Sequence, residues 1–234
     1  FGLTEPEAGS DAGASKTNAK LVNGHWVING SKIFITNSTS SMAGVCTVQS
    51  ITGTRGEGKK EVSCILVPNG TPGFTAKKMT RKMMWRSSDT GELFFDDCRV
   101  PEENLLGKRG EGFHQMLSTL DNGRLAIAAM GLGGAQGAYE LALKYAKERR
   151  LFGKPLSKFQ NTQFVIAELA AEIAVGRSFV DNLIRAHMEG KSVMSETCMA
   201  KFWVTEMAKR VADRCLQIFG GYGYCAEYLI SRFY

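Results

Sequence analysis

The first eleven residues, FGLTEPEAGSD, combine residue types that could bind a polar or charged ligand. An apolar start is followed by Thr4, by an acid before Pro6, and by the turn Gly9-Ser10-Asp11. The hydroxyls and exposed backbone amides of such a turn can donate hydrogen bonds to a phosphate or to a flavin ring. An ordinary acidic turn has the same composition. The stretch is therefore a candidate binding loop whose ligand its own residues leave open.

Two later stretches place charged side chains where a ligand could meet them. LDNGR holds Asp121 three residues before Arg124 and interrupts an apolar helical pattern with Asn122-Gly123. The two charges could form an ordinary i, i+3 ion pair worth roughly a few tenths of a kcal/mol, or they could contact a ligand. Arg149 could complement a helix C-terminus or bind a phosphate, because a guanidinium presents its donors as a rigid fork.

Composition disfavours several other chemistries. The three histidines stand without triad partners, and the six cysteines are widely spaced without a C-x-x-C pair, so we expect no metal site and buried thiols in a reducing compartment. The net charge is +6, but Lys and Arg are scattered, which favours an anionic cofactor or thioester over nucleic acid. No apolar run approaches the roughly 18 to 20 residues of a membrane span.

Residues from about Leu21 to Val100 carry short strand-like patterns such as HWVI, KIFIT and VSCILV. Asn23-Gly24 and Asn29-Gly30 favour tight hairpins, because both turn positions tolerate positive φ. ITGTRGEGKKE is typical of a solvated hairpin loop. We expect a β domain over residues 1–100 and a linker over 101–112, where Pro101 and several glycines turn the chain.

The pattern then changes to a helical period. It predicts three long helices, at about 113–150, 159–189 and 195–219, with Ser195 as a candidate N-cap of the third. Long helices with short connections indicate an antiparallel bundle over residues 113–234. The fold class is therefore α+β with two domains.

Five motifs follow one another in a fixed order along the chain: FGLTEPEAGSD, GSKIFITN, WRSSDTGELFFDDCRVPEENLLG, ERRLFGKPLSKFQ and QIFGGYGY. Together they resemble the acyl-CoA dehydrogenase family over essentially the whole chain. The resemblance implies an FAD flavoprotein with an N-terminal helical domain, a middle β-barrel domain and a C-terminal four-helix bundle. This chain would supply the last two domains, with the bundle incomplete and the N-terminal domain absent.

The resemblance also implies residues that contact FAD. Phe1, Leu3 and Thr4 would meet the flavin, and Ser10 lies where the pyrophosphate and CoA approach. Phe34-Ile35-Thr36 matches the segment that covers one flavin face near N5, although many members have Trp where Phe34 stands. By itself, Phe34 would be a core aromatic residue of a strand.

A second set of residues would reach the FAD of a neighbouring subunit. Arg149 would pair with the pyrophosphate and Phe152 would pack near the adenosine. The set is completed by Gln160, Gln217, Gly220 and Gly221. By themselves, the two glycines would simply end a helix. A cofactor site shared between chains implies a homo-oligomer, usually a tetramer built as a dimer of dimers.

The reaction that the resemblance implies converts an acyl-CoA thioester to the trans-2-enoyl-CoA. A glutamate removes the α-proton while the β-hydride passes to flavin N5. The isovaleryl and long-chain branches place this glutamate immediately before the arginine of LDNGR, where this chain has Gly123. We therefore expect the base beyond Tyr234, no catalytic residue within the chain, and CoA contacts from Asp121, Arg124 and Ser10.

The implied partners are the acyl-CoA and an electron-transferring flavoprotein, and the implied compartment is the bacterial cytoplasm or the mitochondrial matrix. Three alternatives stay open: a non-catalytic relative or truncated product that binds CoA or a partner, an acyl-CoA oxidase, and an enoyl-CoA reductase of the same fold. Acyl chain length, and whether the type is decarboxylating, are also left open.

Overall fold

A computed structural model describes every residue from Phe1 to Tyr234. The chain divides into two compact units, Phe1–Thr119 and Leu120–Tyr234. The division falls inside the long helix α1 (Gly112–Glu148), whereas the sequence predicts a linker at 101–112. Those linker residues instead contain β7 (Leu105–Leu106), which pairs with β4 (Lys60–Pro68) and so belongs to the sheet of the first unit.

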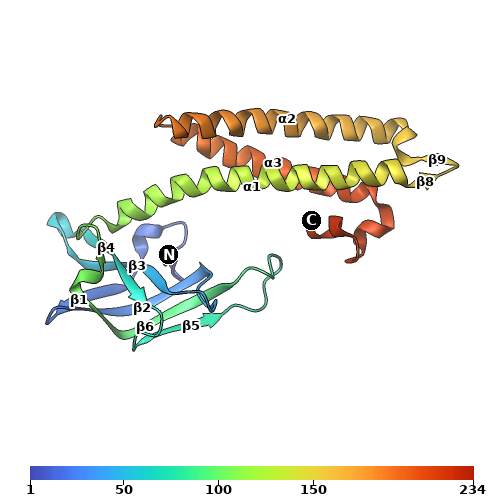
Figure 1. The fold of residues 1–234 in the computed structure, drawn as a ribbon. Helices are drawn as coiled ribbons and strands as arrows, with labels where there is room; N and C mark the ends of the chain where they lie inside the picture. The colour runs from blue at the N-terminus through green and yellow to red at the C-terminus, as the bar shows by residue number, and fades with distance from the viewer. The chain divides into compact units, whose positions relative to one another are not determined.

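The first unit is built on one seven-stranded sheet with the order β5-β6-β2-β1-β3-β4-β7 (Figure 1). The remaining strands are β1 (Asn18–Val22), β2 (His25–Thr36), β3 (Val45–Thr54), β5 (Phe74–Lys78) and β6 (Thr90–Pro101). The β1–β3 pair is parallel and the other pairs are antiparallel. The sheet is therefore mixed, and the predicted α+β class is confirmed.

The two Asn-Gly pairs have different structures. Asn23 and Gly24 both have positive φ and join β1 to β2, as predicted for a hairpin. The predicted turn at Asn29-Gly30 is wrong, because β2 continues through it with a register shift against β6. The Asn29 side chain exchanges two hydrogen bonds with Asp97, of 3.0 and 2.9 Å. A Cβ on Gly30 would lie 2.7 Å from the Thr17 Cα, so this glycine permits a close crossing of two strands.

Alternating positions of the long strands bury the core of the first unit. Trp26, Ile28, Val48, Ile65 and Leu93 are all essentially inaccessible to solvent. Because side chains along a strand alternate between the two faces of the sheet, these residues point into the core and their sequence neighbours point away from it. Burying each large apolar side chain contributes about 1.5–3 kcal/mol.

The second unit is built on long helices. The helices α2 (Gln160–Met188) and α3 (Met194–Ile218) follow α1, and all three bounds lie within two residues of the predicted ones. Figure 1 shows α1, α2 and α3 running in alternating directions, which confirms the antiparallel arrangement. Short 3-10 turns, η5 (Gly220–Tyr224) and η6 (Leu229–Arg232), come after α3. None of the helices combines the length and apolar character that a bilayer crossing requires.

Small residues let these helices approach one another. Five alanines of α1 are fully buried, and Gly176 of α2 leaves room for the Met207 and Trp203 side chains of α3. Asn122-Gly123 interrupts the apolar pattern but not the helix, since α1 is continuous through both residues, as the predicted helix over 113–150 requires. Both residues are exposed there. As poor helix formers they lower the stability of the helix without breaking it.

A small hairpin connects α1 to α2. It is formed by β8 (Arg150–Leu151) and β9 (Lys154–Pro155), and the turn η4 (Leu156–Lys158) then leads into α2. Phe152 and Gly153 have positive φ at the tip of the hairpin. The tip therefore presents the Phe152 side chain to solvent, where it is 94% exposed.

Candidate functional site

The N-terminal segment of the sheet unit is held between β2 and β3. The Gly2 N–H donates to the Thr47 carbonyl at 2.7 Å, and the Gln49 N–H donates to the Gly2 carbonyl at 3.0 Å. On the other side, the Ile33 N–H donates to the Thr4 carbonyl at 2.9 Å. Residues 1–4 therefore lie directly beside the 34–36 segment, although the two come from separate sequence motifs.

Phe34 is turned outward by an irregularity in β2. The register against β6 shifts between Lys32 and Ile35, and Phe34 has φ +61° in this bulge. Its side chain is 61% exposed, while Ile35 is buried. A left-handed backbone is unfavourable for a bulky residue and is typical of functional positions that the surrounding structure holds in place. Phe34 therefore lies outside the core, and its contact with a ligand stays a prediction.

A cavity of about 260 Å³ opens beside this segment. Phe1, Ile35 and Thr36 line it, together with Met42, Cys46 and Phe74. Phe1 is half exposed, and burial raises the pKa of the Cys46 thiol. Leu3, Thr4 and Ser10 are not part of the lining: the first two are partly buried beside β2, and Ser10 is exposed in its turn. The surface thus offers exposed aromatic rings, a hydroxyl and strand backbone, which suits a flat heteroaromatic group.

A larger cavity of about 700 Å³ lies in the helical unit. The structure brings four of the predicted residues to its lining: Arg149, Gln217, Gly220 and Gly221. Gly220 has φ +59°, and a Cβ on either glycine would meet no atom within 4 Å. This stretch of backbone is therefore open, and a ligand could approach it closely.

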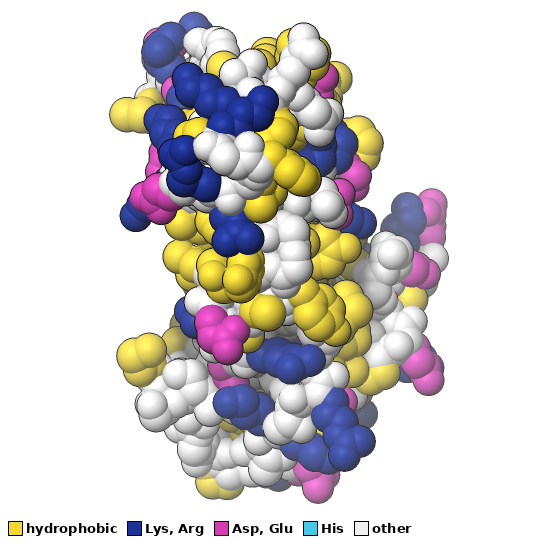
Figure 2. Space-filling model, turned by 90° about the vertical axis from the view of Figure 1, so that its right-hand side faces the viewer, with side chains coloured by type: hydrophobic (Ala, Val, Ile, Leu, Met, Phe, Trp, Pro, Cys, Tyr) yellow, Lys and Arg dark blue, Asp and Glu magenta, His cyan; other side chains and the backbone are white.

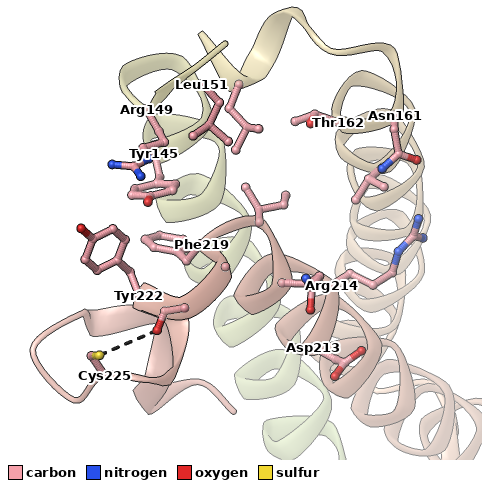
Figure 3. A pocket seen from close by; sticks show the side chains of 16 residues that line it. Tyr145, Arg149, Leu151, Asn161, Thr162, Asp213, Arg214, Phe219, Tyr222 and Cys225 are labelled. Atoms are coloured by element: carbon pink, nitrogen blue, oxygen red, sulfur yellow. Dashed lines mark hydrogen bonds between the residues drawn. The ribbon is translucent and has the colours of Figure 1, made fainter.

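Aromatic side chains form one wall of this cavity (Figure 3). The Arg149 Cζ lies 5.3 Å from the centre of the Tyr222 ring, and Tyr222 packs on Tyr228 at 5.0 Å. Tyr145 stacks on Phe219 at 4.1 Å, and burial raises the pKa of the Tyr145 hydroxyl. The wall thus holds the guanidinium of Arg149 against aromatic faces.

The opposite wall contains residues that the sequence reasoning missed. Figure 3 shows Asn161 of α2, and Asp213 and Arg214 of α3, across from Arg149. The Arg214 Nη2 bonds the Glu168 carboxylate at 2.5 Å. The sequence does contain a local signal for Arg214. It lies three residues before the motif residue Gln217 on the same helix, so the two side chains share one helix face.

Two predicted residues do not line the large cavity. Phe152 stands at the hairpin tip edge-on to Phe159, with ring centres 6.3 Å apart, and Gln160 is the exposed first residue of α2. The Lys154 ammonium lies 4.3 Å from the centre of the Phe159 ring. Figure 2 views the molecule from the side of this hairpin and shows Lys and Arg side chains gathered at its upper end. The positive charge at this end favours the binding of an anionic group.

Asp121 and Arg124 form a separate pair on α1. The Arg124 Nη1 lies 2.5 Å from the Asp121 Oδ1, and both side chains are about one-third exposed. Gly123 between them has no side chain and therefore offers no carboxylate, and the space beside it is open. An exposed i, i+3 pair contributes only about 0.2–0.5 kcal/mol. The pair can therefore exchange its partners for a ligand at small cost.

Comparison with family models covers nearly the whole chain. Residues 1–98 match the middle domain of acyl-CoA dehydrogenases, and residues 110–234 match the C-terminal domain. A probable acyl-CoA dehydrogenase of Bacillus subtilis is 44% identical over 99% of this chain. An acryloyl-CoA reductase (NADH) of Anaerotignum propionicum is 43% identical over 100% of it. The chain spans about 60% of the length of these two relatives.

A solved structure of a similar protein is also available. It is a glutaryl-CoA dehydrogenase from Mycobacterium smegmatis in complex with FADH2. The two chains are 33% identical, with a TM-score of 0.90, over 100% of this chain and 58% of the other.

Proposed function

Because the chain belongs to the acyl-CoA dehydrogenase family, we propose that it forms part of an FAD-dependent enzyme that oxidises an acyl-CoA to the trans-2-enoyl-CoA. The observation that carries this proposal is the exposed, strained Phe34 beside the Leu3-Thr4 segment. An exposed aromatic ring on a strained backbone is unfavourable in the free protein, and such strain is typical of positions that contact a ligand.

The residues of the sheet unit fit a flavin ring. Phe1 and Phe34 offer exposed aromatic surface, and Thr4 and Thr36 offer hydroxyls beside strand backbone. When bound, FAD would accept the hydride that leaves the β-carbon. Preorganised donors at the flavin edge would stabilise the negative charge that reduction places on the ring, because they are already oriented.

The residues of the helical unit fit the phosphate-bearing half of FAD. Arg149 would bind the pyrophosphate, and the open backbone of Gly220 and Gly221 would allow close approach. Phe152, Gln160 and Gln217 would contact the same half, with Phe152 packing near the adenosine. We propose that this set serves the FAD of a neighbouring subunit, which requires a homo-oligomer, and that the oligomer is a tetramer built as a dimer of dimers.

None of the residues proposed to contact the substrate serves as the catalytic base. Ser10, Asp121 and Arg124 would contact the CoA part of the ligand. Glu5 cannot serve as the base, because it is buried and paired with Lys32. Gly123 carries no side chain, so we place the base outside residues 1–234.

The direction of the reaction is the remaining choice. The probable dehydrogenase and the NADH-dependent reductase have almost equal identity to this chain, so enoyl-CoA reduction is the second candidate function. For the oxidative direction, the expected electron acceptor is an electron-transferring flavoprotein. Absorbance of the bound flavin would distinguish the two directions.

The test uses the complete protein loaded with FAD under anaerobic conditions. Saturated acyl-CoAs of several chain lengths are added, and the flavin absorbance is followed. Bleaching, with reoxidation by an electron-transferring flavoprotein and not by oxygen, is the expected result. If no acyl-CoA bleaches the flavin, but an enoyl-CoA reoxidises the reduced enzyme, the reductase function holds. If neither occurs, the chain is a non-catalytic relative.

A further inference from the structure

A charged pair is buried beneath the candidate flavin surface of the sheet unit. The Lys32 side chain is fully buried, and its Nζ lies 2.8 Å from the Glu5 Oε1. The same ammonium donates to the Leu3 carbonyl at 3.2 Å. One side chain of β2 therefore ties down both Leu3 and Glu5, the residues on either side of Thr4.

Glu5 is bound from a third segment as well. The Lys16 N–H donates to its Oε2 at 2.6 Å, and the Thr17 N–H donates to its Oε1 at 3.1 Å. Burial favours neutral forms of both groups and lowers the pKa of Lys32. For Glu5, burial opposes ionisation, but the hydrogen bonds from Lys32, Lys16 and Thr17 together hold its pKa below the ordinary value. Hydrogen bonds from Lys32, Lys16 and Thr17 therefore satisfy both oxygens of the Glu5 carboxyl.

The position of the pair links it to Phe34. Lys32 is the last β2 residue in regular register with β6 before the bulge that contains Phe34. Its aliphatic stem runs under the N-terminal segment, since a Cβ on Gly2 would lie 3.1 Å from the Lys32 Cγ. The Ile33 N–H bond to the Thr4 carbonyl completes the connection. Both segments that would face the flavin are thus anchored to the same two side chains.

A buried ion pair is a poor way to gain stability. Its desolvation cost offsets most of the attraction, and well-packed apolar residues of similar volume are often as stabilising or better. What apolar residues cannot supply is direction: the Lys32 ammonium donates to the Leu3 carbonyl and to the Glu5 carboxylate, and each of these bonds has a preferred geometry. A strained residue such as Phe34 persists only where its surroundings determine it closely.

We propose that Lys32 and Glu5 are positioning residues that set the geometry of the flavin-binding surface by fixing Leu3-Thr4 against the Phe34 bulge. This inference rests on the proposed function. Neither side chain would touch the cofactor; both would act through the backbone of residues 3–5 and 33–34. The pair should therefore affect FAD affinity and the flavin spectrum more than it affects folding.

The test compares Lys32→Met with the double variant Lys32→Met/Glu5→Gln in the complete protein. The single variant leaves a carboxylate buried without its cation, which is strongly destabilising and can prevent folding. The double variant removes both charges at similar volume, and we expect the FAD-free protein to unfold near the wild-type temperature. We still expect its Kd for FAD to rise about tenfold or more, because small displacements of contact groups are costly.

The readouts are the Kd for FAD, the shape of the visible absorption band of bound FAD, and the unfolding temperature without FAD. Lys16→Met is the matched control, because it removes the exposed Lys16–Glu7 pair in the same region and leaves the Lys16 N–H bond to Glu5. We expect all three readouts to stay at wild-type values in this control. A changed Kd and absorption band in a stably folded double variant supports the proposal.

Two other outcomes lead to different conclusions. If the double variant binds FAD with wild-type Kd and an unchanged band, the pair is only structural and the inference is overturned while the proposed function stands. If the wild-type protein itself does not bind FAD, the proposed function fails, and the positioning role fails with it.

Discussion

The guanidinium of Arg149 lies over the face of Tyr222, with 5.3 Å from its Cζ to the ring centre. Arg149 directly follows α1, and Tyr222 lies in η5, the turn after α3. The ring of Tyr228 packs on the ring of Tyr222. A cation held on an aromatic face has fewer conformations to lose when it binds a phosphate. The ring therefore preorganises the arginine that is expected to meet the FAD pyrophosphate.

Replacing Tyr222 tests this relationship. Tyr222→Leu should raise the Kd for FAD about two- to fivefold, which corresponds to about 0.5–1 kcal/mol for a cation–π contact at an exposed site. Tyr222→Phe keeps the ring and should bind as the wild type does. Titration of the FAD-free complete protein with FAD gives both values. An equal loss in the Phe variant would assign the effect to the hydroxyl and not to the ring.

Phe34→Gly should separate ligand binding from stability. The substitution relieves the left-handed strain of roughly 1–2 kcal/mol but adds backbone freedom to the unfolded chain. Because the ring is mostly exposed, the free energy of unfolding without FAD should change by only about 1 kcal/mol, while FAD affinity falls. Phe95→Ala is the contrast: Phe95 is buried and stacks on Phe74, so about 3–5 kcal/mol should be lost. A comparable loss in Phe34→Gly would show that Phe34 belongs to the core.

Two helix glycines should respond oppositely to alanine. Gly123 faces open space in α1, so Gly123→Ala should stabilise the chain by up to about 1 kcal/mol through helix propensity. At Gly176 a Cβ would lie 3.2 Å from both Met207 Cε and Trp203 Cζ3, so Gly176→Ala should show no such gain or a loss. Denaturant midpoints of the two variants measure this difference. The same gain at both positions would mean that α2 and α3 do not pack closely at Gly176.

Alkaline pH should destabilise the fold through its buried thiols. Burial raises the pKa of Cys64 and Cys98 to about 11 and that of Cys215 to about 12, from an ordinary value of 9.0. The folded state keeps these protons where the unfolded state releases them, so stability is complete below pH 9 and falls as the pH rises toward 11 and 12. Denaturant midpoints between pH 8 and pH 11 should show this decline.

Cysteine variants provide the control for the pH dependence. Cys98→Ala should make the decline shallower, whereas Cys198→Ser should leave it unchanged, because Cys198 is exposed. Alkylation of the folded protein followed by mass spectrometry should label Cys198 before the three buried thiols. Equal labelling of Cys98 and Cys198 under native conditions would contradict the burial on which this prediction depends.

Local signals explain how much of the fold could be predicted. The three helices begin and end within two residues of their predicted bounds, because helical periodicity and terminal residues are local properties. The two Asn-Gly pairs show the limit. Both have turn-forming sequences, but only Asn23-Gly24 makes a turn, since Asn29 is held by Asp97 and Gly30 by its approach to Thr17.

The candidate site also contains some residues that could be predicted from the sequence and others that could not. The motif residues Arg149, Gln217, Gly220 and Gly221 were predicted, and the structure places them on one cavity. Tyr145, Asn161 and Arg214 complete that cavity, and they were not predicted. Arg214 is three residues from the motif residue Gln217 on α3, but only the packing of α1, α2 and α3 brings Tyr145 and Asn161 to the same cavity.

The sequence by itself determined the family, the α+β class, the helix positions and the identity of most candidate ligand contacts, because these follow from residue types and short-range spacing. Only the tertiary structure decided that Lys32 pairs with Glu5, 27 residues away, that Phe34 turns outward, and that Arg149 lies on Tyr222. The physical reason is that local preferences act over a few residues. The burial of a charge or the stacking of two side chains depends on which distant segments fill the same space.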